Sequence, residues 1–234
     1  MHLSGKIAMK SENLSLSPVF RGNLQIMGIL AAFFSLGIEL SAQKGRNELP
    51  EWTVEEIEAI HLAVTALQGI FPRATSLHQA LGGVRIVKLR MSYGGTARAH
   101  RITVNAHGFS VWTVVHELAH AWDAVHKWRL SARMKEELGA GFRHPLWRRL
   151  EPENPLWWYN VGQGPPPCGV DANFNAKEDF AESVTALVYP EEARRLAAAR
   201  GWPYEDARRG YDYGAFAETP RGRFVAGLIS SMGK

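Results

Sequence analysis

The stretch VVHELAHAWDAVH, from Val114 to His126, constrains the fold more than any other part of the sequence. The segment from Ser110 to about Val125 contains no Pro or Gly and is rich in apolar residues, so it predicts a buried α-helix. On such a helix His116 and His120 lie one turn apart on the same face, where their ring nitrogens can converge on a single ion. Because burying ionisable groups without a partner is costly, the helix predicts a metal site inside the fold.

Glu117 turns the histidine pair into an HExxH pattern. In this pattern the two imidazoles bind zinc and the glutamate acts as general base. Zinc lowers the pKa of its bound water toward about 7, and the carboxylate takes the proton as the hydroxide attacks a carbonyl, then delivers it to the leaving amine. We therefore predict that His116 and His120 bind zinc and that Glu117 is catalytic. The alternative is that two histidines at this spacing are ordinary groups on a structural helix.

A catalytic zinc ion usually has three protein ligands, so a third must come from elsewhere in the chain. His126 fits the spacing of the longer pattern HExxHxxGxxH, but Asp123 stands where that pattern has a glycine that ends the helix. If the helix continues, His126 lies about 15 Å along its axis from His116, too far to share the ion. His126 is therefore the less favoured of two candidates.

The second candidate lies on a later helix, which the segment from Asn175 to Pro190 predicts. Glu178 and Glu182 fall one turn apart on the same face of this helix. A glutamate brought to an HExxH helix completes a His2Glu site, so Glu178 is the favoured third ligand. The alternatives are that Glu178 only caps its own helix and that Glu182 is solvated.

The two helices together resemble the zincin catalytic domain of the anthrax lethal factor family. The sequence reads HELAHAWD and, 58 residues after His120, EDFAES, where that family has an HExxHAxD helix completed by the first glutamate of an ExFAE helix. The resemblance implies a zinc metalloendopeptidase that is gluzincin-like in its ligand set. Its three zinc ligands and its general base would be His116, His120, Glu178 and Glu117. Asp123 and Glu182 would be the carboxylates that orient the imidazoles.

One residue of the family is missing at its usual place. In the family a tyrosine that can stabilise the oxyanion precedes the glutamate helix, whereas the corresponding position here is about Asp171. Either Tyr159, Tyr211 or Tyr213 takes this role, or no residue does.

The segments around the HExxH helix predict an α+β fold. Thr53 and Glu56 form a capping box at the start of a first helix. Val84–Tyr93 predicts a strand, GGT predicts a turn, and RITVN at Arg101–Asn105 predicts a second short strand. The resemblance implies a zincin-like arrangement, in which a small mixed sheet packs on the active-site helix and a mainly helical C-terminal part follows. RITVN is the candidate edge strand that pairs with an extended substrate, or else an ordinary strand of the sheet.

The segment from Pro145 to Gly169 is long, irregular and aromatic, and it lies between the two halves of the predicted site. It is either a lid over the site or, as we favour, a satellite hydrophobic cluster. Two further helices are predicted at Pro190–Gly201 and Thr219–Ser230. Cys168 is the only cysteine, so the chain can form neither an intrachain disulfide nor a thiolate zinc cluster, and we expect this thiol to be unreactive.

The N-terminal segment, residues 1–49, differs from the domain predicted for residues 50–234. Basic residues precede an apolar run from Leu24 to Ile38, which is typical of a signal peptide, here cleaved after Ala42. The run is short for a membrane span, which needs about 20 apolar residues. We expect a secreted protein or one that associates with a membrane through this segment. The alternatives are a helix that packs on the domain, a misassigned start codon, and a cytoplasmic protein.

Composition limits the expected partners. The 27 Lys and Arg are interspersed with 23 acidic residues, which leaves a net charge of +4 without a long run of like charges, so nucleic acid is not an expected partner. The expected partner is a peptide or protein substrate, and the sequence does not fix the oligomeric state. The alternative class is a non-catalytic zincin-like binding module with a structural metal.

Overall fold

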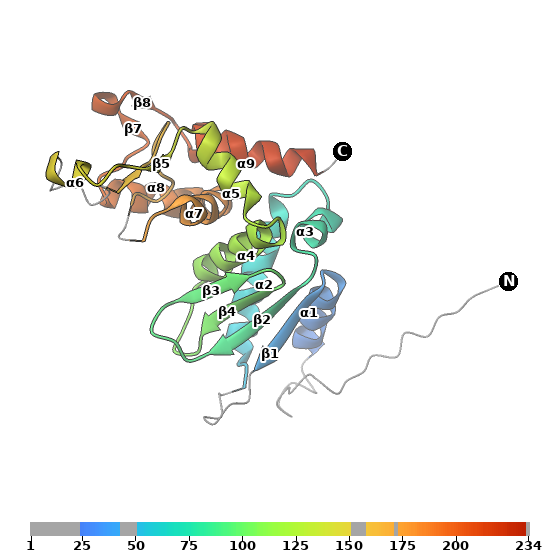
Figure 1. Ribbon diagram of the computed structural model, residues 1–234. Helices are drawn as coiled ribbons and strands as arrows, with labels where there is room; N and C mark the ends of the chain where they lie inside the picture. Colours follow the sequence, from blue (N-terminus) through green and yellow to red (C-terminus); the bar gives the residue numbers. More distant parts are fainter. Residues whose placement is uncertain (1–23, 43–50, 151–157, 171–172, 233–234) are drawn as a thin grey trace.

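A computed structural model of the chain describes residues 24–42, 51–150, 158–170 and 173–232 (Figure 1). A small sheet with helices against it occupies the lower part of Figure 1, and further helices occupy the upper part. This mixture of helices with a small mixed sheet confirms the expected α+β class.

The main sheet has four strands in the order β1-β2-β4-β3. The strands are β1 (Ile38–Ala42), β2 (Val84–Leu89), β3 (Gly95–Arg98) and β4 (Arg101–Asn105). β1, β2 and β4 run parallel, and β3 is antiparallel to β4. The prediction that RITVN is the edge strand is therefore wrong, because β3 covers the outer side of β4. β2 also ends earlier than predicted, at Leu89 instead of Tyr93.

β3 was not predicted because it is short and begins with glycine. GGT was expected to form a turn, but Gly95 pairs with Val104 of β4 and opens the strand. The chain reverses between Leu89 and Gly95, in bends that include Gly94, and again at Ala99 and His100, where His100 takes a left-handed backbone with φ of 62°. Glycine and alanine carry little β propensity, so the pairing with β4 and not the local sequence determines this strand.

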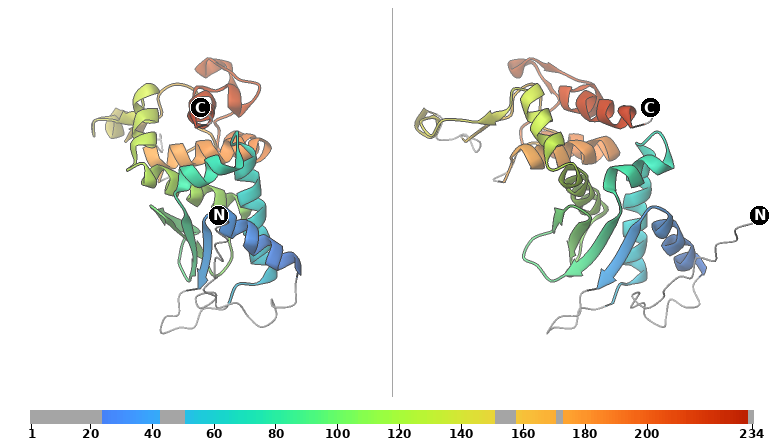
Figure 2. Two further views of the ribbon diagram at one scale, coloured as in Figure 1. Left: turned by 90° about the vertical axis from the view of Figure 1, so that its right-hand side faces the viewer. Right: turned by 45° about the vertical axis from the view of Figure 1, so that its right-hand side comes forward.

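Helices cover one face of the sheet. The helices that pack in this part of the molecule are α1 (Leu24–Ser35), α2 (Val54–Gly69), α3 (Ala74–Leu81) and α4 (Val111–Val125). The left panel of Figure 2 shows α1 and α2 on the same side of the strands, and α4 packs against β3 and β4. The predicted capping box of Thr53 and Glu56 is confirmed at the start of α2, with both of its hydrogen bonds present.

One hydrophobic core joins the sheet to these helices. Ile86 and Ile102 enter it from the strands, and Val115 and Leu118 enter it from α4, all with no exposed surface. Such a core forms because alternate residues of each strand and one stripe of each helix are apolar. α4 thus carries the HExxH residues from a position that is anchored on the sheet.

The segment that resembles a signal peptide contributes to the same core. Ile26, Ile29 and Phe33 of α1 are buried, α1 packs on α2, and β1 pairs in parallel with β2. This is the packing expected of the alternative in which a helix packs on the domain. Export, and cleavage after Ala42, stay predictions. None of the described helices is long and apolar enough to cross a membrane.

The C-terminal part is mainly helical. Its helices are α5 (Arg129–Glu137), α6 (Trp147–Leu150), α7 (Ala176–Val188), α8 (Pro190–Ala199) and α9 (Pro220–Ser231), with 3-10 helices η3 (Ala207–Arg209) and η4 (Phe216–Glu218). Two short ladders join β5 (Gly141–Phe142) to β6 (Tyr159–Asn160) and β7 (Glu205–Asp206) to β8 (Tyr211–Asp212). The three helices predicted from Asn175 onward are α7, α8 and α9. α7 packs against α4, α5, α8 and α9, so it links this part to the sheet.

The aromatic segment from Pro145 to Gly169 contributes Tyr159 and Val161 to a small hydrophobic cluster that is separate from the main core. Val170 and Phe174, which follow the segment, complete this cluster. This packing agrees with the favoured interpretation as a satellite cluster, although Trp157 lies outside the described residues. Cys168 is buried in another small cluster, and burial raises the pKa of its thiol, as expected for an unreactive cysteine.

Candidate metal centre

Two helix starts set the positions of the side chains in the predicted site. Ser110 caps α4 by accepting a hydrogen bond from the Thr113 N–H at 3.1 Å. Asn175 caps α7 by accepting from the N–H groups of Lys177 and Glu178. Because a cap fixes the residue at which a helix begins, it also fixes the face on which each later residue lies. Both caps are where the sequence predicted the helices to start.

α4 and α7 pack closely against each other. Trp122 of α4 and Phe180 of α7 are in contact, with ring centroids 5.6 Å apart. Ala119 and Ala181 are buried in the same core, and such small side chains allow the helix backbones to approach. The packing brings the first turn of α7 over the face of α4 that carries the histidines.

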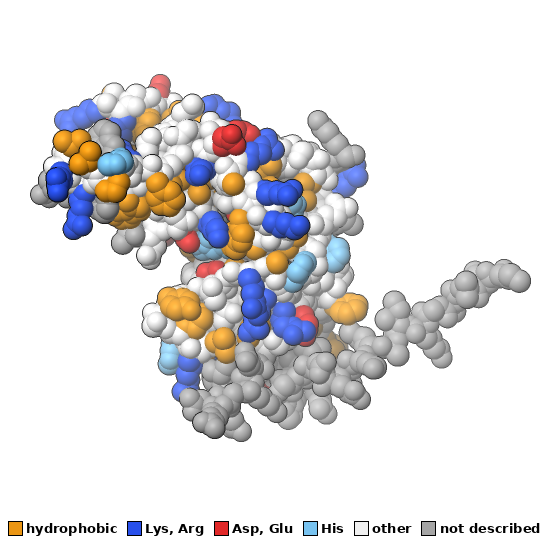
Figure 3. Space-filling model, viewed as in Figure 1, with side chains coloured by type: hydrophobic (Ala, Val, Ile, Leu, Met, Phe, Trp, Pro, Cys, Tyr) orange, Lys and Arg blue, Asp and Glu red, His pale blue; other side chains and the backbone are white. Residues whose placement is uncertain are grey.

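The three side chains predicted to bind zinc meet where α4 and α7 cross. Glu178 Oε2 lies 3.1 Å from His116 Nε2 and 3.3 Å from His120 Nε2. One donor atom from each residue lies within 4.8 Å of the others. Figure 3 shows the surface hollowed between the sheet and the upper helices, with acidic and histidine side chains visible in the hollow. The side chains of His116, His120 and Glu178 are 17%, 10% and 33% exposed, so the structure brings the predicted ligands together at a place that solvent reaches.

The spacing of these donor atoms fits a metal ion. Zinc binds imidazole nitrogen and carboxylate oxygen at about 2.0–2.2 Å, so two of its tetrahedral ligands lie about 3.3 Å apart. The separations of Glu178 Oε2 from the two nitrogens, 3.1 Å and 3.3 Å, are close to that value. Two imidazoles and one carboxylate are also the donor set of zinc sites that keep one position open.

The charges in this group depend on one another. Burial would raise the pKa of Glu178, but hydrogen bonds with His116 and His120 outweigh it and hold the pKa well below its usual range. Burial would lower the pKa of His116, yet the hydrogen bond and charge of Glu178 and the charges of Glu117 and Glu182 raise it. Glu178 is therefore ionised at neutral pH, as a metal-binding carboxylate must be.

Glu117 lies beside the three residues and against the edge strand. Its side chain is buried, and its Oε2 has no hydrogen-bond partner among the described residues. Burial raises the pKa of Glu117 to about 7, which suits a group that takes up and returns a proton near neutral pH. A Cβ placed on Gly95 would lie only 2.6 Å from Glu117 Oε1, so β3 and this carboxylate are packed together.

The two carboxylates predicted to orient the imidazoles have different surroundings. Asp123 is fully buried, and its Oδ1 accepts hydrogen bonds from the N–H groups of Leu130 and Ser131, so Asp123 holds the start of α5. Glu182 is buried one turn after Glu178, and its charge helps to raise the pKa of His116. The orienting role stays a prediction for both residues.

The alternative ligand His126 is not part of the group. It forms the C-cap of α4, and its Nδ1 lies 3.0 Å from the Trp122 carbonyl oxygen. The structure thus brings Glu178, and not His126, to His116 and His120.

The three candidate tyrosines for the oxyanion role make other contacts in the described part of the chain. Tyr159 lies in the satellite cluster, where it packs on Phe174. The Tyr211 hydroxyl donates to the Gly164 carbonyl at 3.2 Å, and Tyr213 packs against the cluster around Cys168. The structure records no contact between these tyrosines and the predicted zinc ligands within the described ranges.

Three contacts next to the site were not predicted from the sequence. The Trp128 ring lies edge-on to His120, with centroids 6.4 Å apart, and Lys177 Nζ lies 3.7 Å from the Trp128 centroid. Asp179, the residue after Glu178, forms a buried ion pair with Arg221 of α9, with Nε 2.6 Å from Oδ1. The contacts of Lys177 with Trp128 and of Asp179 with Arg221 join residues remote in the chain, so no local sequence pattern predicts them.

A scan of the chain against models of known protein families found no match. Searches among curated proteins and among solved structures found none either.

Proposed function

We propose that the protein is a zinc-dependent metalloendopeptidase with a zincin-like catalytic domain. The observation that carries the proposal is the position of Glu178 Oε2, 3.1 Å and 3.3 Å from the Nε2 atoms of His116 and His120. Two imidazoles and a carboxylate from a second helix, beside a buried glutamate, are the groups that metal-assisted amide hydrolysis requires. The motif resemblance supports the same conclusion independently of these distances.

Each residue of the group has one task in this proposal. His116, His120 and Glu178 hold the ion. A zinc ion there would supply Lewis acidity, which lowers the pKa of water and polarises a carbonyl group. Glu117 takes one proton from the attacking water and returns it to the nitrogen of the leaving amine. Because burial raises the pKa of Glu117 to about 7, neither transfer is strongly uphill near neutral pH.

The edge strand β3 gives the substrate backbone a place to bind. β3 is the outer strand of the sheet on the side of α4, and Gly95 packs against Glu117. An extended peptide that adds to β3 as a further strand passes the carboxylate at Gly95. In this proposal β3 takes the role that the sequence had suggested for RITVN.

A Glu117→Gln substitution tests the catalytic assignment. It preserves the shape of the side chain and removes the base, so we expect an unchanged zinc content and cleavage of a random peptide library slowed by about 10²- to 10⁴-fold, measured by mass spectrometry. The matched control is Glu191→Gln on the exposed start of α8, which should cleave as the wild type does. Cleavage that survives Glu117→Gln would refute the assignment.

The same library distinguishes the alternative class. A wild-type protein that holds zinc but cleaves none of the peptides would favour a non-catalytic zincin-like binding module with a structural metal.

A further inference from the structure

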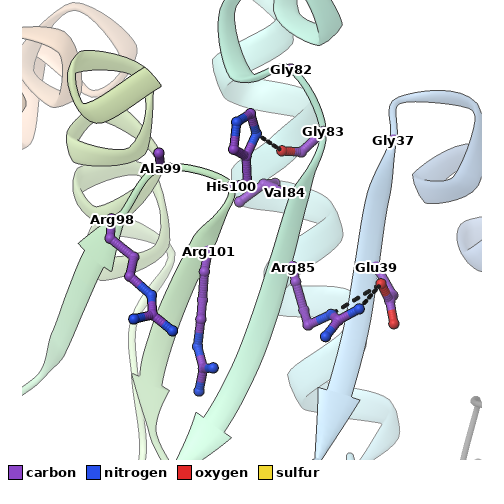
Figure 4. Close-up of a pocket in the computed structure, with 10 residues that line it drawn as sticks. All are labelled: Gly37, Glu39, Gly82, Gly83, Val84, Arg85, Arg98, Ala99, His100 and Arg101. Atoms are coloured by element: carbon purple, nitrogen blue, oxygen red, sulfur yellow. Dashed lines mark hydrogen bonds and ion pairs between the residues drawn. The ribbon is translucent and has the colours of Figure 1, made fainter. Parts of the chain in front are cut away.

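Three arginine side chains lie side by side on one face of the sheet (Figure 4). α1 and α2 lie on the opposite side of the strands (Figure 2). The strand register puts Arg85 of β2 opposite Arg101 of β4, and Arg101 opposite Arg98 of β3. Neighbouring strands are about 4.8 Å apart, so the guanidinium groups form a compact row. Like charges directly opposite one another destabilise a sheet. Such a row therefore indicates an anionic ligand.

The row contains one carboxylate. Glu39 of β1 continues it beside Arg85, and Glu39 Oε2 lies 3.0 Å from Arg85 Nη2. Arg98 and Arg101 lie farther along the row, toward the edge of the sheet, and both line a hollow that Thr96 and Thr103 also line. Figure 3 shows Lys and Arg side chains over the front of the sheet. The part of the row next to β3 thus carries two arginines, Arg98 and Arg101, on paired positions.

The outer edge of β3 can accept another strand. Asn105 N–H donates to the Gly94 carbonyl at 3.1 Å, and in an antiparallel ladder the bonded and non-bonded residues alternate. The backbone N–H and C=O groups of Gly95 and Ala97 therefore point away from β4. These are the groups that an added peptide strand would use.

Side chains alternate between the two faces of β3, so a peptide paired with β3 would also direct its side chains alternately to the two faces of the sheet. The Cβ direction of Gly95 leads to Glu117, whereas Thr96 and Arg98 are on the exposed face. A residue paired with Gly95 would therefore face Glu117. A residue paired with Arg98 would lie on the arginine face, about 10 Å along the strand.

We propose that this edge selects extended peptides with an acidic side chain opposite Arg98. The inference rests on the proposed function for the role of β3 and deepens it by naming the substrate class. An aspartate or glutamate at that position would have its Cβ about 5 Å from that of Arg98 and would reach Arg101 behind it. A guanidinium presents a planar set of donors that matches a carboxylate in two parallel hydrogen bonds.

A peptide fits this face better than nucleic acid does. Nucleic acid binds through a series of phosphate contacts, which needs a longer basic track than a row that ends in the Arg85–Glu39 pair. The edge strand beside Arg98 offers alternating backbone N–H and C=O groups, which match the backbone of an extended polypeptide.

Binding to the Glu117→Gln protein tests the inference without turnover. Three fluorescein-labelled Thr/Ala decapeptides with a central Glu, Gln or Lys would be titrated by fluorescence anisotropy in the presence of zinc. We expect the Glu peptide to bind about fivefold more tightly than the Gln peptide, as for one exposed ion pair, and the Lys peptide to bind more weakly. Adding Arg98→Ala should weaken the preference for Glu, because only the more distant Arg101 then remains, and Arg98→Glu should reverse it in favour of Lys.

Arg208→Glu on η3 is the matched control, because it makes the same change of charge on an exposed residue outside the sheet and should leave the preference unchanged. Equal binding of the three peptides, a preference for Glu that survives Arg98→Glu, or tighter binding of a single-stranded decanucleotide would overturn the inference. Incubating the wild type with the same peptides separates the two proposals. Cleavage without preference for Glu contradicts only the selectivity, whereas preferential binding without cleavage contradicts only the peptidase.

Discussion

Gly95 determines where the carboxylate of Glu117 can lie. A Cβ at this position would stand 2.6 Å from both Cγ and Oε1 of Glu117. Gly94 next to it has room, since the nearest atom to its Cβ position is Thr113 Cγ2 at 3.6 Å. Neither glycine has a positive φ, so alanine can adopt the backbone conformation at both sites. The two alanine variants therefore differ only in the atoms that the new methyl group contacts.

We predict that Gly95→Ala lowers kcat/KM for peptide cleavage by about 100-fold, the cost of displacing a catalytic group by roughly 1 Å. Zinc content should be unchanged, because the three ligands lie on other elements. Gly94→Ala should retain activity close to that of the wild type. Equal activity of the two variants would show that Glu117 does not depend on its packing against β3.

At the scale of elements, a buried ion pair links the first turn of helix α7 to helix α9. Arg221 and Asp179 are both fully buried, and Arg221 also donates to the Val161 and Gln163 carbonyl groups. Removing one partner leaves an uncompensated buried charge. Because Asp179 follows Glu178, this pair also helps to hold the predicted third ligand in place.

We predict that Arg221→Met lowers the free energy of unfolding by about 3–5 kcal/mol in urea denaturation. Arg223→Met is the control, because Arg223 lies exposed on the same helix and its loss should change stability by no more than about 0.5 kcal/mol. A comparable loss in both variants would mean that the Arg221–Asp179 pair has no special role.

At this scale, the sequence predicted only those helices and strands whose signals lie in neighbouring residues. Caps and periodicity located α2, α4 and α7 within a residue or two, because both signals lie inside the helix itself. β3 carries no such signal, so its pairing and the place of RITVN inside the sheet could not be inferred. The ligand set followed from two motifs and a resemblance, whereas the contacts of Gly95 with Glu117 and of Asp179 with Arg221 depend on how remote elements pack.

At the scale of the whole molecule, the N-terminal helix and strand belong to the core. An apolar run of this length suits both a signal peptide and a packed helix, so composition alone could not decide between them. The structure places Ile26, Ile29, Phe33, Ile38 and Leu40 in the main hydrophobic core. Burying each such side chain contributes about 1.5–3 kcal/mol, which together rivals the usual stability of a domain.

We predict that a chain starting at Gln43 does not fold cooperatively, as measured by thermal unfolding followed by circular dichroism. A chain starting at Leu24 keeps α1 and β1 and is the control that should unfold cooperatively. If the shorter chain melted at the same temperature as the control, α1 and β1 would be dispensable and cleavage after Ala42 would be compatible with the fold.

Zinc analysis of four purified proteins tests most directly whether His116, His120 and Glu178 form one metal site. The wild type and the His126→Ala variant should each hold close to one zinc ion per chain, because His126 only caps α4. The His116→Ala and Glu178→Ala variants should lose most of it while retaining their helical circular dichroism. Full zinc content in the Glu178→Ala variant, or its loss in the His126→Ala variant, would contradict the site.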